Sequence, residues 1–180
     1  MKINKKIFIF LIFVIVVTAY TVGSTINSQK DSYSIIIAFG DSLTDNGNTY
    51  KKSLEVLPND KTWYKGRFSN YKVWVEYLCQ YSKDKNCKLL DYAYGGAYSL
   101  DGYQKVEVND KIIYKLITNY LQQVENFAGD KKQYDSDHTL YVMDIGSNDI
   151  MELKDKKLQI AKNIDEAIQI LISKKMLNIF

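Results

Sequence analysis

The chain has 180 residues, of which 46% are hydrophobic and 25% are charged, and its formal net charge is +3. This composition is typical of a globular protein and excludes a disordered, collagen-like or multi-pass membrane protein. The small net charge and the dispersed lysines do not indicate a nucleic-acid partner. Arg67 is the only arginine and His138 the only histidine, which excludes multi-arginine phosphate clamps and multi-histidine metal sites. No metal or organic cofactor is implied.

The N-terminal segment has the pattern of an export signal. Three lysines in the first six residues precede the apolar run Ile7–Val17, and small residues follow at Gly23 and Ser24. A membrane-spanning helix needs about 20 apolar residues, so a cleaved signal peptide is favoured and an uncleaved membrane anchor stays open. Either interpretation predicts a secreted or membrane-anchored protein, with a leader at 1–23 and one domain at 24–180.

Two cysteines, Cys79 and Cys87, lie close together in the chain. In an oxidising compartment such a pair is able to form a local disulfide, which would stabilise the fold by about 2–4 kcal/mol at most. The sequence favours this disulfide, and two unlinked thiols remain the alternative.

Taken in chain order, apolar patterning predicts alternating strands and helices. Short β-branched runs predict strands, and apolar residues at helical spacing predict amphipathic helices. The expected elements are strand 34–39, helix 73–82, strand 88–92, a small hairpin at 106–114, helix 116–127, strand 139–143, helix 153–171 and a new strand beginning at 176–180. Such alternation implies an α/β fold with a mostly parallel sheet.

Polar and small residues follow three of the predicted strands. Ser42 follows the first strand, Gly96 the second and Asn148 the third. In parallel α/β folds the active crevice lies at the carboxyl ends of the strands. A serine hydroxyl there is able to act as a nucleophile, and backbone and amide N–H groups are able to stabilise an oxyanion. Each signal alone is weak, because such residues are common in turns and at helix starts.

The residues around these strand ends resemble the GDSL (SGNH) esterases and lipases. Phe39–Asn48 resembles the family's first block, Tyr92–Ala97 the second and Gly146–Asp149 the third. Gly66–Asn70, followed by Val73–Leu78, resembles the segment between the first two blocks. The resemblance implies a three-layer α/β/α, flavodoxin-like fold with a parallel sheet. It also implies an ester hydrolase, most similar to fungal carbohydrate-acetyl esterases and to the lipase and hemolysin branch.

The resemblance also implies roles for individual residues. Ser42 is expected to be the nucleophile and one oxyanion donor, and Gly96 and Asn148 the other two donors. The expected substrate is a small-molecule, polysaccharide or lipid ester. The residues expected to support the site are Asp41, Asp45, Asn48 and Asp149.

Two departures from the family pattern affect the loops around the site. Asp91 stands where the second block normally opens with Asn, which is expected to alter a supporting hydrogen bond near Gly96. Tyr71 and Lys72 stand where the family often has Gly-Pro, so that turn is expected to be less rigid. Trp63 and Tyr64 are interpreted equally well as sugar-stacking residues or as ordinary surface aromatics.

A third departure concerns the catalytic base. The family's Asp-x-x-His block, which supplies the catalytic Asp and His near the C-terminus, is expected to be absent, and the chain to be the N-terminal part of the domain. His138 precedes the strand that leads to Asn148, which puts it roughly 23 Å from the crevice side. It is interpreted as a solvated loop residue beside Asp137. Two functions therefore stay open: an exported serine ester hydrolase, and a non-catalytic module that binds carbohydrate or lipid.

Overall fold

A computed structural model describes most of the chain. The chain divides into two compact units, Met1–Ser32 and Tyr33–Phe180, and nearly all described residues belong to the second. The predicted leader and the predicted strand at 176–180 lie outside the described residues. Among the described residues, no helix is long and apolar enough to cross a membrane. The described ranges are 32–108, 110–130, 134–152 and 157–174.

The described elements alternate as the sequence predicts, with boundaries shifted by a few residues. They are β1 (Ile35–Gly40), α2 (Asn48–Lys52), α3 (Val75–Tyr81), β2 (Lys88–Asp91), β3 (Tyr103–Val108), β4 (Lys111–Thr118), α4 (Tyr120–Gly129), the 3₁₀ turn η1 (Ser136–His138), β5 (Thr139–Asp144), α5 (Ser147–Glu152) and α6 (Lys157–Ser173).

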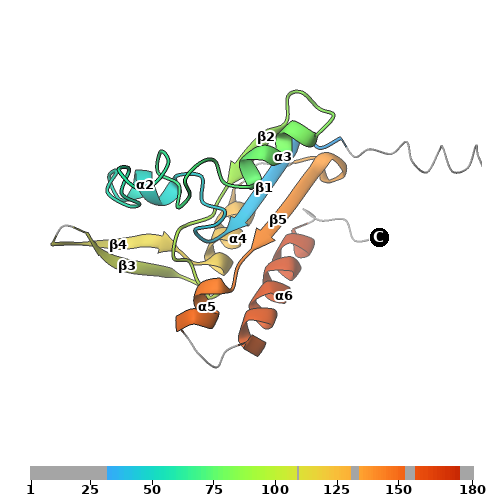
Figure 1. Cartoon of the computed structure of the whole chain (residues 1–180). Helices are drawn as coiled ribbons and strands as arrows, with labels where there is room; N and C mark the ends of the chain where they lie inside the picture. Colours follow the sequence, from blue (N-terminus) through green and yellow to red (C-terminus); the bar gives the residue numbers. More distant parts are fainter. Residues whose placement is uncertain (1–31, 109, 131–133, 153–156, 175–180) are drawn as a thin grey trace, which may run out of the picture. The chain divides into compact units, whose positions relative to one another are not determined.

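Three parallel strands form the central sheet, in the order β2-β1-β5 (Figure 1). Ile35 of β1 pairs with Lys88 of β2 and with Thr139 of β5, and the pairing with β5 continues to Gly40 and Asp144. The carboxyl ends of β1 and β5 therefore lie next to each other. The predicted α/β class with a parallel sheet is confirmed.

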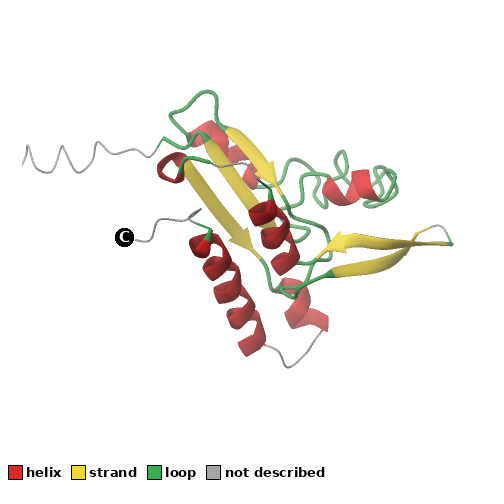
Figure 2. Ribbon diagram, turned by 180° about the vertical axis from the view of Figure 1, so that it is seen from behind, coloured by secondary structure: helices red, strands yellow, loops and turns green. Residues whose placement is uncertain are grey.

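Side chains of β1 alternate between two apolar layers, as the period of a strand requires. Ile37 and Phe39 pack with α4 and α6, through residues such as Phe127 and Leu171. Ala38 points to the other face, where Val73 and Val75 cover it. Figure 2 shows α4 and α6 on one face of the sheet, and Figure 1 shows α3 on the other. The described fold therefore has three layers, α/β/α.

The hairpin of β3 and β4 is a separate two-stranded sheet that extends away from the parallel sheet (Figures 1 and 2). It is longer than the predicted 106–114, and it takes up residues that the sequence assigned to a helix. Leu116 lies in β4, and α4 begins only at Tyr120. The prediction of a helix from 116 is wrong at its start. Leu116 belongs to the strand, but it lies four positions before Tyr120 and so happens to match the spacing of the helix that follows.

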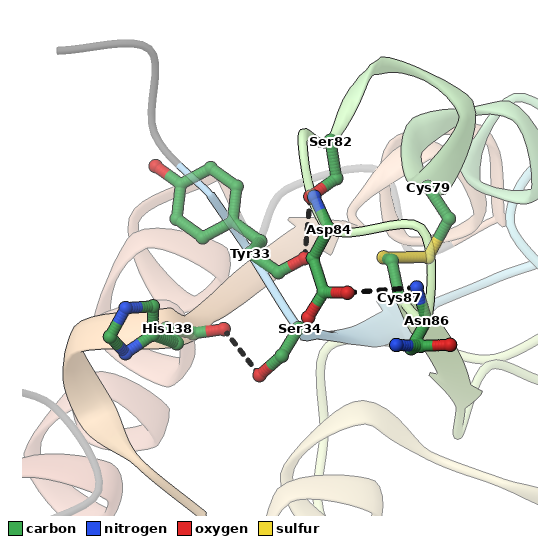
Figure 3. The surroundings of a disulfide bond; sticks show 8 residues. All are labelled: Tyr33, Ser34, Cys79, Ser82, Asp84, Asn86, Cys87 and His138. Atoms are coloured by element: carbon green, nitrogen blue, oxygen red, sulfur yellow. Dashed lines mark hydrogen bonds between the residues drawn. A yellow bond between two sulfur atoms is a disulfide. The ribbon is translucent and has the colours of Figure 1, made fainter.

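The C-terminal part has two helices, α5 and α6, where the sequence predicts a single one. Gly146 has φ 116°, a conformation that favours glycine, and it separates β5 from the short α5. The predicted disulfide is confirmed: Cys79 in α3 is bonded to Cys87 just before β2, with their Cα atoms 5.4 Å apart (Figure 3). It ties α3 to the start of its neighbouring strand.

Candidate active site

Ser42 lies in the turn that follows the central strand, and its side chain is half-buried. The N–H groups of Thr44 and Asp45 donate to the backbone oxygen of Asp41, at 3.1 and 3.0 Å, and close this turn. A Cβ atom on Gly40 would lie only 2.5 Å from the backbone oxygen of Asp144 in β5. The missing side chain at Gly40 therefore allows β1 and β5 to come together just before the serine.

The carboxyl group of Asp41 is buried directly beside Ser42. Its Oδ1 accepts the N–H of Leu43 at 3.0 Å, whereas Oδ2 has no hydrogen-bond partner among the described residues. Burial, with smaller contributions from Asp144 and Asp149, raises the pKa of Asp41 above its usual value. Burial therefore disfavours the charged form of the Asp41 carboxyl group.

Asp45 joins the first block to the second. Its buried carboxylate accepts four backbone N–H groups: those of Gly47 and Asn48 at Oδ1, and those of Thr49 and Gly95 at Oδ2, over 2.6–3.1 Å. These four hydrogen bonds tie the turn after β1 and the start of α2 to the glycine loop around Gly95. The contacts of Asp45 suit the supporting role that the resemblance implies.

Asn48 and Asp91 make the second connection between these blocks. The side-chain amide of Asn48 donates to the backbone oxygens of Asp91 and Ala93, at 2.9 and 3.0 Å. The Asp91 carboxylate in turn accepts the N–H groups of Asn46 and Ala93, at 2.8 and 2.9 Å. Burial raises the pKa of Asp91 to about 8, although these two hydrogen bonds act to lower it. Asp91 therefore introduces a titrating group into the scaffold of the site.

The two glycines of the second block have different tasks. Gly95 donates to Asp45 Oδ2 and to Thr49 Oγ1, and a Cβ atom there would lie 2.1 Å from Cε2 of the Phe68 ring. The ring packs directly on the backbone of this loop. Gly96 has φ 81°, in the left-handed region that other residues rarely adopt. The loop thus depends on glycine for packing at one position and for conformation at the next.

The third block begins the short helix α5. The side-chain amide of Asn148 donates to the backbone oxygen of Ala97 at 2.9 Å, which ties this block to the second. Asp149 is buried and accepts the backbone N–H and the hydroxyl of Ser99, at 2.9 and 2.7 Å. Asn163 of α6 donates to the same hydroxyl at 3.0 Å. Helix α5 is therefore anchored to the loop that follows Gly96.

These contacts bring the three predicted blocks to one end of the sheet. The N–H of Tyr94 donates to the backbone oxygen of Gly40 at 3.2 Å, which joins the second block to the first. Gly40 pairs with Asp144, which leads into the third block, and Asn148 bonds to Ala97 of the second. The segments that carry Ser42, Gly96 and Asn148 are therefore neighbours. Their roles in chemistry stay predictions.

Gln123 is a residue of this region that the sequence analysis missed. It lies in α4, fully buried, and its Nε2 donates to the backbone oxygens of Gly40 and Thr118, at 2.9 and 2.8 Å. Its Oε1 accepts the N–H of Gly40 at 2.9 Å. No motif marks this position, because a glutamine on an amphipathic helix is usually exposed.

His138 lies at the opposite end of the sheet from Ser42. Its backbone oxygen accepts the N–H of Ser34 at 2.9 Å, just before β1 begins, and also the Ser34 hydroxyl at 3.3 Å (Figure 3). Gly40 lies six positions after Ser34 along the strand, so the two residues are about 20 Å apart. The imidazole is exposed and its Nδ1 lies 2.8 Å from Asp135 Oδ2.

The expectation that no Asp-x-x-His block is present is wrong as a statement about the sequence. Residues 135–138 have that spacing, and the structure pairs Asp135 with His138. The partner of the imidazole Nδ1 is thus Asp135, three positions earlier, and not the adjacent Asp137. The conclusion about distance still holds, since the pair stands at the amino ends of the strands.

The sequence is similar to a protein-family model and to known proteins. A model of the family described as GDSL-like lipase/acylhydrolase matches residues 36–176. The chain is 34% identical over 123 residues, 68% of its length, to the thermolabile hemolysin of Vibrio parahaemolyticus, of which this covers 27%. It is 31% identical over 174 residues, 97% of its length, to the phosphatidylcholine-sterol acyltransferase of Aeromonas hydrophila, of which this covers 48%. The chain thus spans about half or less of these relatives.

Proposed function

Because the chain belongs to the GDSL-like lipase/acylhydrolase family, we propose that it supplies the nucleophile and the oxyanion donors of an ester hydrolase. The observation that carries the proposal is the meeting of the three blocks at the carboxyl ends of parallel strands. Tyr94 of the second block donates to Gly40, and Asn148 of the third block donates to Ala97 of the second, which supports a shared site near the turn of Ser42.

In the proposed reaction, Ser42 Oγ attacks the carbonyl carbon of the ester and loses its proton to a base. The carbonyl electron pair moves onto the oxygen, where the N–H groups of Ser42 and Gly96 and the amide of Asn148 stabilise it. One hydrogen of the Asn148 amide is used on Ala97, and the second stays available for the oxyanion. Collapse expels the alcohol, which takes up a proton, and water then releases the acid from Ser42.

A lipid acyl ester is the substrate that we favour. Apolar side chains are exposed directly beside the proposed catalytic residues: Leu43 is 53% exposed, Ile150 58% and Met151 67%. Exposed apolar groups around a site are typical of apolar ligands or lipid surfaces. One relative is named as acting on phosphatidylcholine and a sterol. A carbohydrate ester is the alternative, for which Trp63, 39% exposed, offers a stacking surface.

His138 is unsuited to accept the proton of Ser42, because it lies at the far end of the sheet. This observation favours a second candidate function, a non-catalytic module that binds lipid or carbohydrate esters. The two functions differ in whether Ser42 forms a bond with the substrate. We further propose that the basic and apolar start of the chain exports it, which a fusion of residues 1–23 to a reporter that is active only outside the cytosol would test.

Chemical rescue with imidazole separates the two functions. The full chain and the Ser42→Ala and Asn148→Ala variants are assayed on 4-nitrophenyl acetate and on a longer 4-nitrophenyl acyl ester, with imidazole added as the missing base. The hydrolase proposal predicts imidazole-dependent turnover that requires Ser42, is reduced about 10²–10³-fold without Asn148 and is faster on the longer acyl chain. Ser173→Ala, which changes an exposed serine at the end of α6, is the matched control. Equal rates for wild type and Ser42→Ala would favour the binding module.

A further inference from the structure

A cluster of two lysines and two tyrosines lies beside the glycine loop. Lys52, the last residue of α2, places its Nζ 4.7 Å from the centre of the Tyr94 ring and 5.6 Å from that of Tyr103. Lys115 of β4 places its Nζ 5.0 Å from the centre of the Tyr103 ring. Lys52 also donates to Thr118 Oγ1 at 3.3 Å. We call Lys52, Tyr94, Tyr103 and Lys115 the lysine–tyrosine cluster.

Neither ammonium group has a carboxylate partner within the described part of the chain. The ion pairs found there join Arg67 to Glu76 and His138 to Asp135. Burial lowers the pKa of Lys52, and the positive charge of Lys115 lowers it further. Two mutually repelling cations without an ion-pair partner among the described residues create a local positive potential, which an anion would neutralise.

The backbone holds Lys115 at this place in an uncommon conformation. The register of the hairpin shifts between Gln104 and Val106, which pair with Ile117 and Ile113 respectively, so the residues around Lys115 form a bulge in β4. Lys115 itself has φ 56°, which is uncommon for a residue with a side chain. Bulges next to active sites often re-aim a side chain. Here the bulged residue is the one whose ammonium group lies over Tyr103.

The cluster borders the proposed active site through two contacts. Tyr94, whose ring lies under Lys52, directly precedes the glycine loop and donates its N–H to Gly40. Gln104, the neighbour of Tyr103 in β3, donates its side-chain amide to the backbone oxygen of Gly96 at 3.0 Å. An anion at the cluster would therefore lie next to an ester bound at Ser42. Tyr103 is 38% exposed, and Lys115 is exposed, so the cluster is open to solvent.

We infer that the lysine–tyrosine cluster binds a phosphate group, either as free phosphate or as the phosphate of a lipid headgroup. A phosphate offers several acceptor oxygens to the point charges of the two ammonium groups. A site for a lipid headgroup rests on the proposed function, because the acyl ester of the same lipid would then lie at Ser42 and its phosphate at Lys52 and Lys115. A site for the anion itself stands independently of any activity at Ser42.

Titration of the full chain with inorganic phosphate, at constant ionic strength, tests the site. The Lys52→Met and Lys115→Met variants keep most of the apolar part of the lysine side chain. Each is expected to weaken phosphate binding about tenfold, because it removes one charge-assisted hydrogen bond. Lys51→Met, at the exposed neighbouring position in α2, is the matched control, and Lys52→Arg is expected to retain binding. Near-UV circular dichroism and melting curves verify that each variant is folded. Equal weakening by Lys51→Met, or none by Lys52→Met, would overturn the proposal.

A second arm identifies the source of the phosphate. Binding is compared between phosphatidylcholine vesicles and vesicles of a phosphate-free galactolipid. Preference for phosphatidylcholine that is lost in Lys52→Met supports the headgroup site, whereas lysine-dependent binding of inorganic phosphate alone supports a site for the free anion. Ser42→Ala is expected to bind phosphate like wild type. The anion site and the proposed hydrolase activity can therefore fail separately.

Discussion

The side-chain amide of Gln123 forms hydrogen bonds with both backbone polar groups of Gly40, two residues before Ser42. The N–H of Gly40 donates to Oε1 and its oxygen accepts from Nε2, both at 2.9 Å. A buried side chain thus satisfies backbone polar groups at the end of the central strand, just before the turn of Ser42. It also accounts for a polar residue in the apolar layer between α4 and the sheet.

Replacing this amide is expected to destabilise the fold. Gln123→Ala would leave the N–H of Gly40 and the oxygen of Thr118 without this partner, whereas the oxygen of Gly40 keeps the N–H of Tyr94. Buried polar groups that lose their partner cost about 1–3 kcal/mol each. We expect a decrease of about 2–4 kcal/mol in the free energy of unfolding, measured by urea denaturation. Gln122→Ala, which removes an amide that bonds only to neighbouring side chains of α4, should change it by less than about 0.5 kcal/mol. Similar losses for both variants would contradict the role of Gln123.

A methyl group at Gly95 is expected to disrupt the glycine loop. Gly95→Ala places a Cβ atom 2.1 Å from the Phe68 ring, and such overpacking typically destabilises by about 1–3 kcal/mol. Gly129→Ala is the control, because a Cβ atom there meets nothing within 4 Å and alanine is the better helix former. Thermal melting should show a lower Tm for the first variant and an equal or higher Tm for the second. Phe68→Leu should restore part of the loss in Gly95→Ala.

Asp91 is expected to make the stability of the protein depend on pH. Its pKa is raised from 3.8 to about 8 in the folded protein, so between these values the folded chain keeps a proton that the unfolded chain has lost. The free energy of unfolding should then fall as pH rises through this window, by at most about 1.4 kcal/mol per pH unit. Above pH 8 both states are ionised and the effect ends.

Urea denaturation at several values from about pH 5 to about pH 8, inside that window, measures this slope. Asp91→Asn, which introduces the residue usual in the family, should flatten it. Asp165→Asn, at an exposed position in α6, should leave it unchanged. A slope that persists in Asp91→Asn would show that another group is responsible.

His138 is expected to be dispensable at the site of Ser42. His138→Ala should leave imidazole-assisted ester hydrolysis within about twofold of wild type, because about 20 Å separate the two ends of the strand. Steady-state kinetics on a 4-nitrophenyl ester, with Asp135→Ala assayed beside it, check this. A loss comparable to that of Ser42→Ala would place His138 in the reaction and contradict the arrangement described above.

The parallel sheet and its order of elements were predictable because β-branched runs and helical spacing are local signals. The extent of the hairpin was not predictable, since Leu116 fits both a strand and a helix pattern. Only its packing in the folded chain decides to which element it belongs. Predicted supporting residues such as Asp45 and Asn48 lie within recognisable blocks. Gln123 carries no local signal, because its role arises from the approach of α4 to β1, 83 positions apart in the chain.

The same limit explains the misjudged Asp-x-x-His spacing. Asp135 and His138 are paired as a local motif predicts, yet a local motif does not reveal at which end of the sheet it lies. That follows from the register of β5 against β1, in which Thr139 faces Ile35 and Asp144 faces Gly40. Position relative to the strand ends, rather than spacing in sequence, decides which residues meet Ser42.

The central claim is that Ser42 becomes acylated, and intact-mass spectrometry with peptide mapping tests it most directly. The full chain is incubated with a 4-nitrophenyl acyl ester and imidazole, then quenched in acid. The account predicts one acyl group, located on Ser42, that forms more slowly in Asn148→Ala and is absent in Ser42→Ala. Acylation spread over surface lysines with Ser42 unmodified would contradict it.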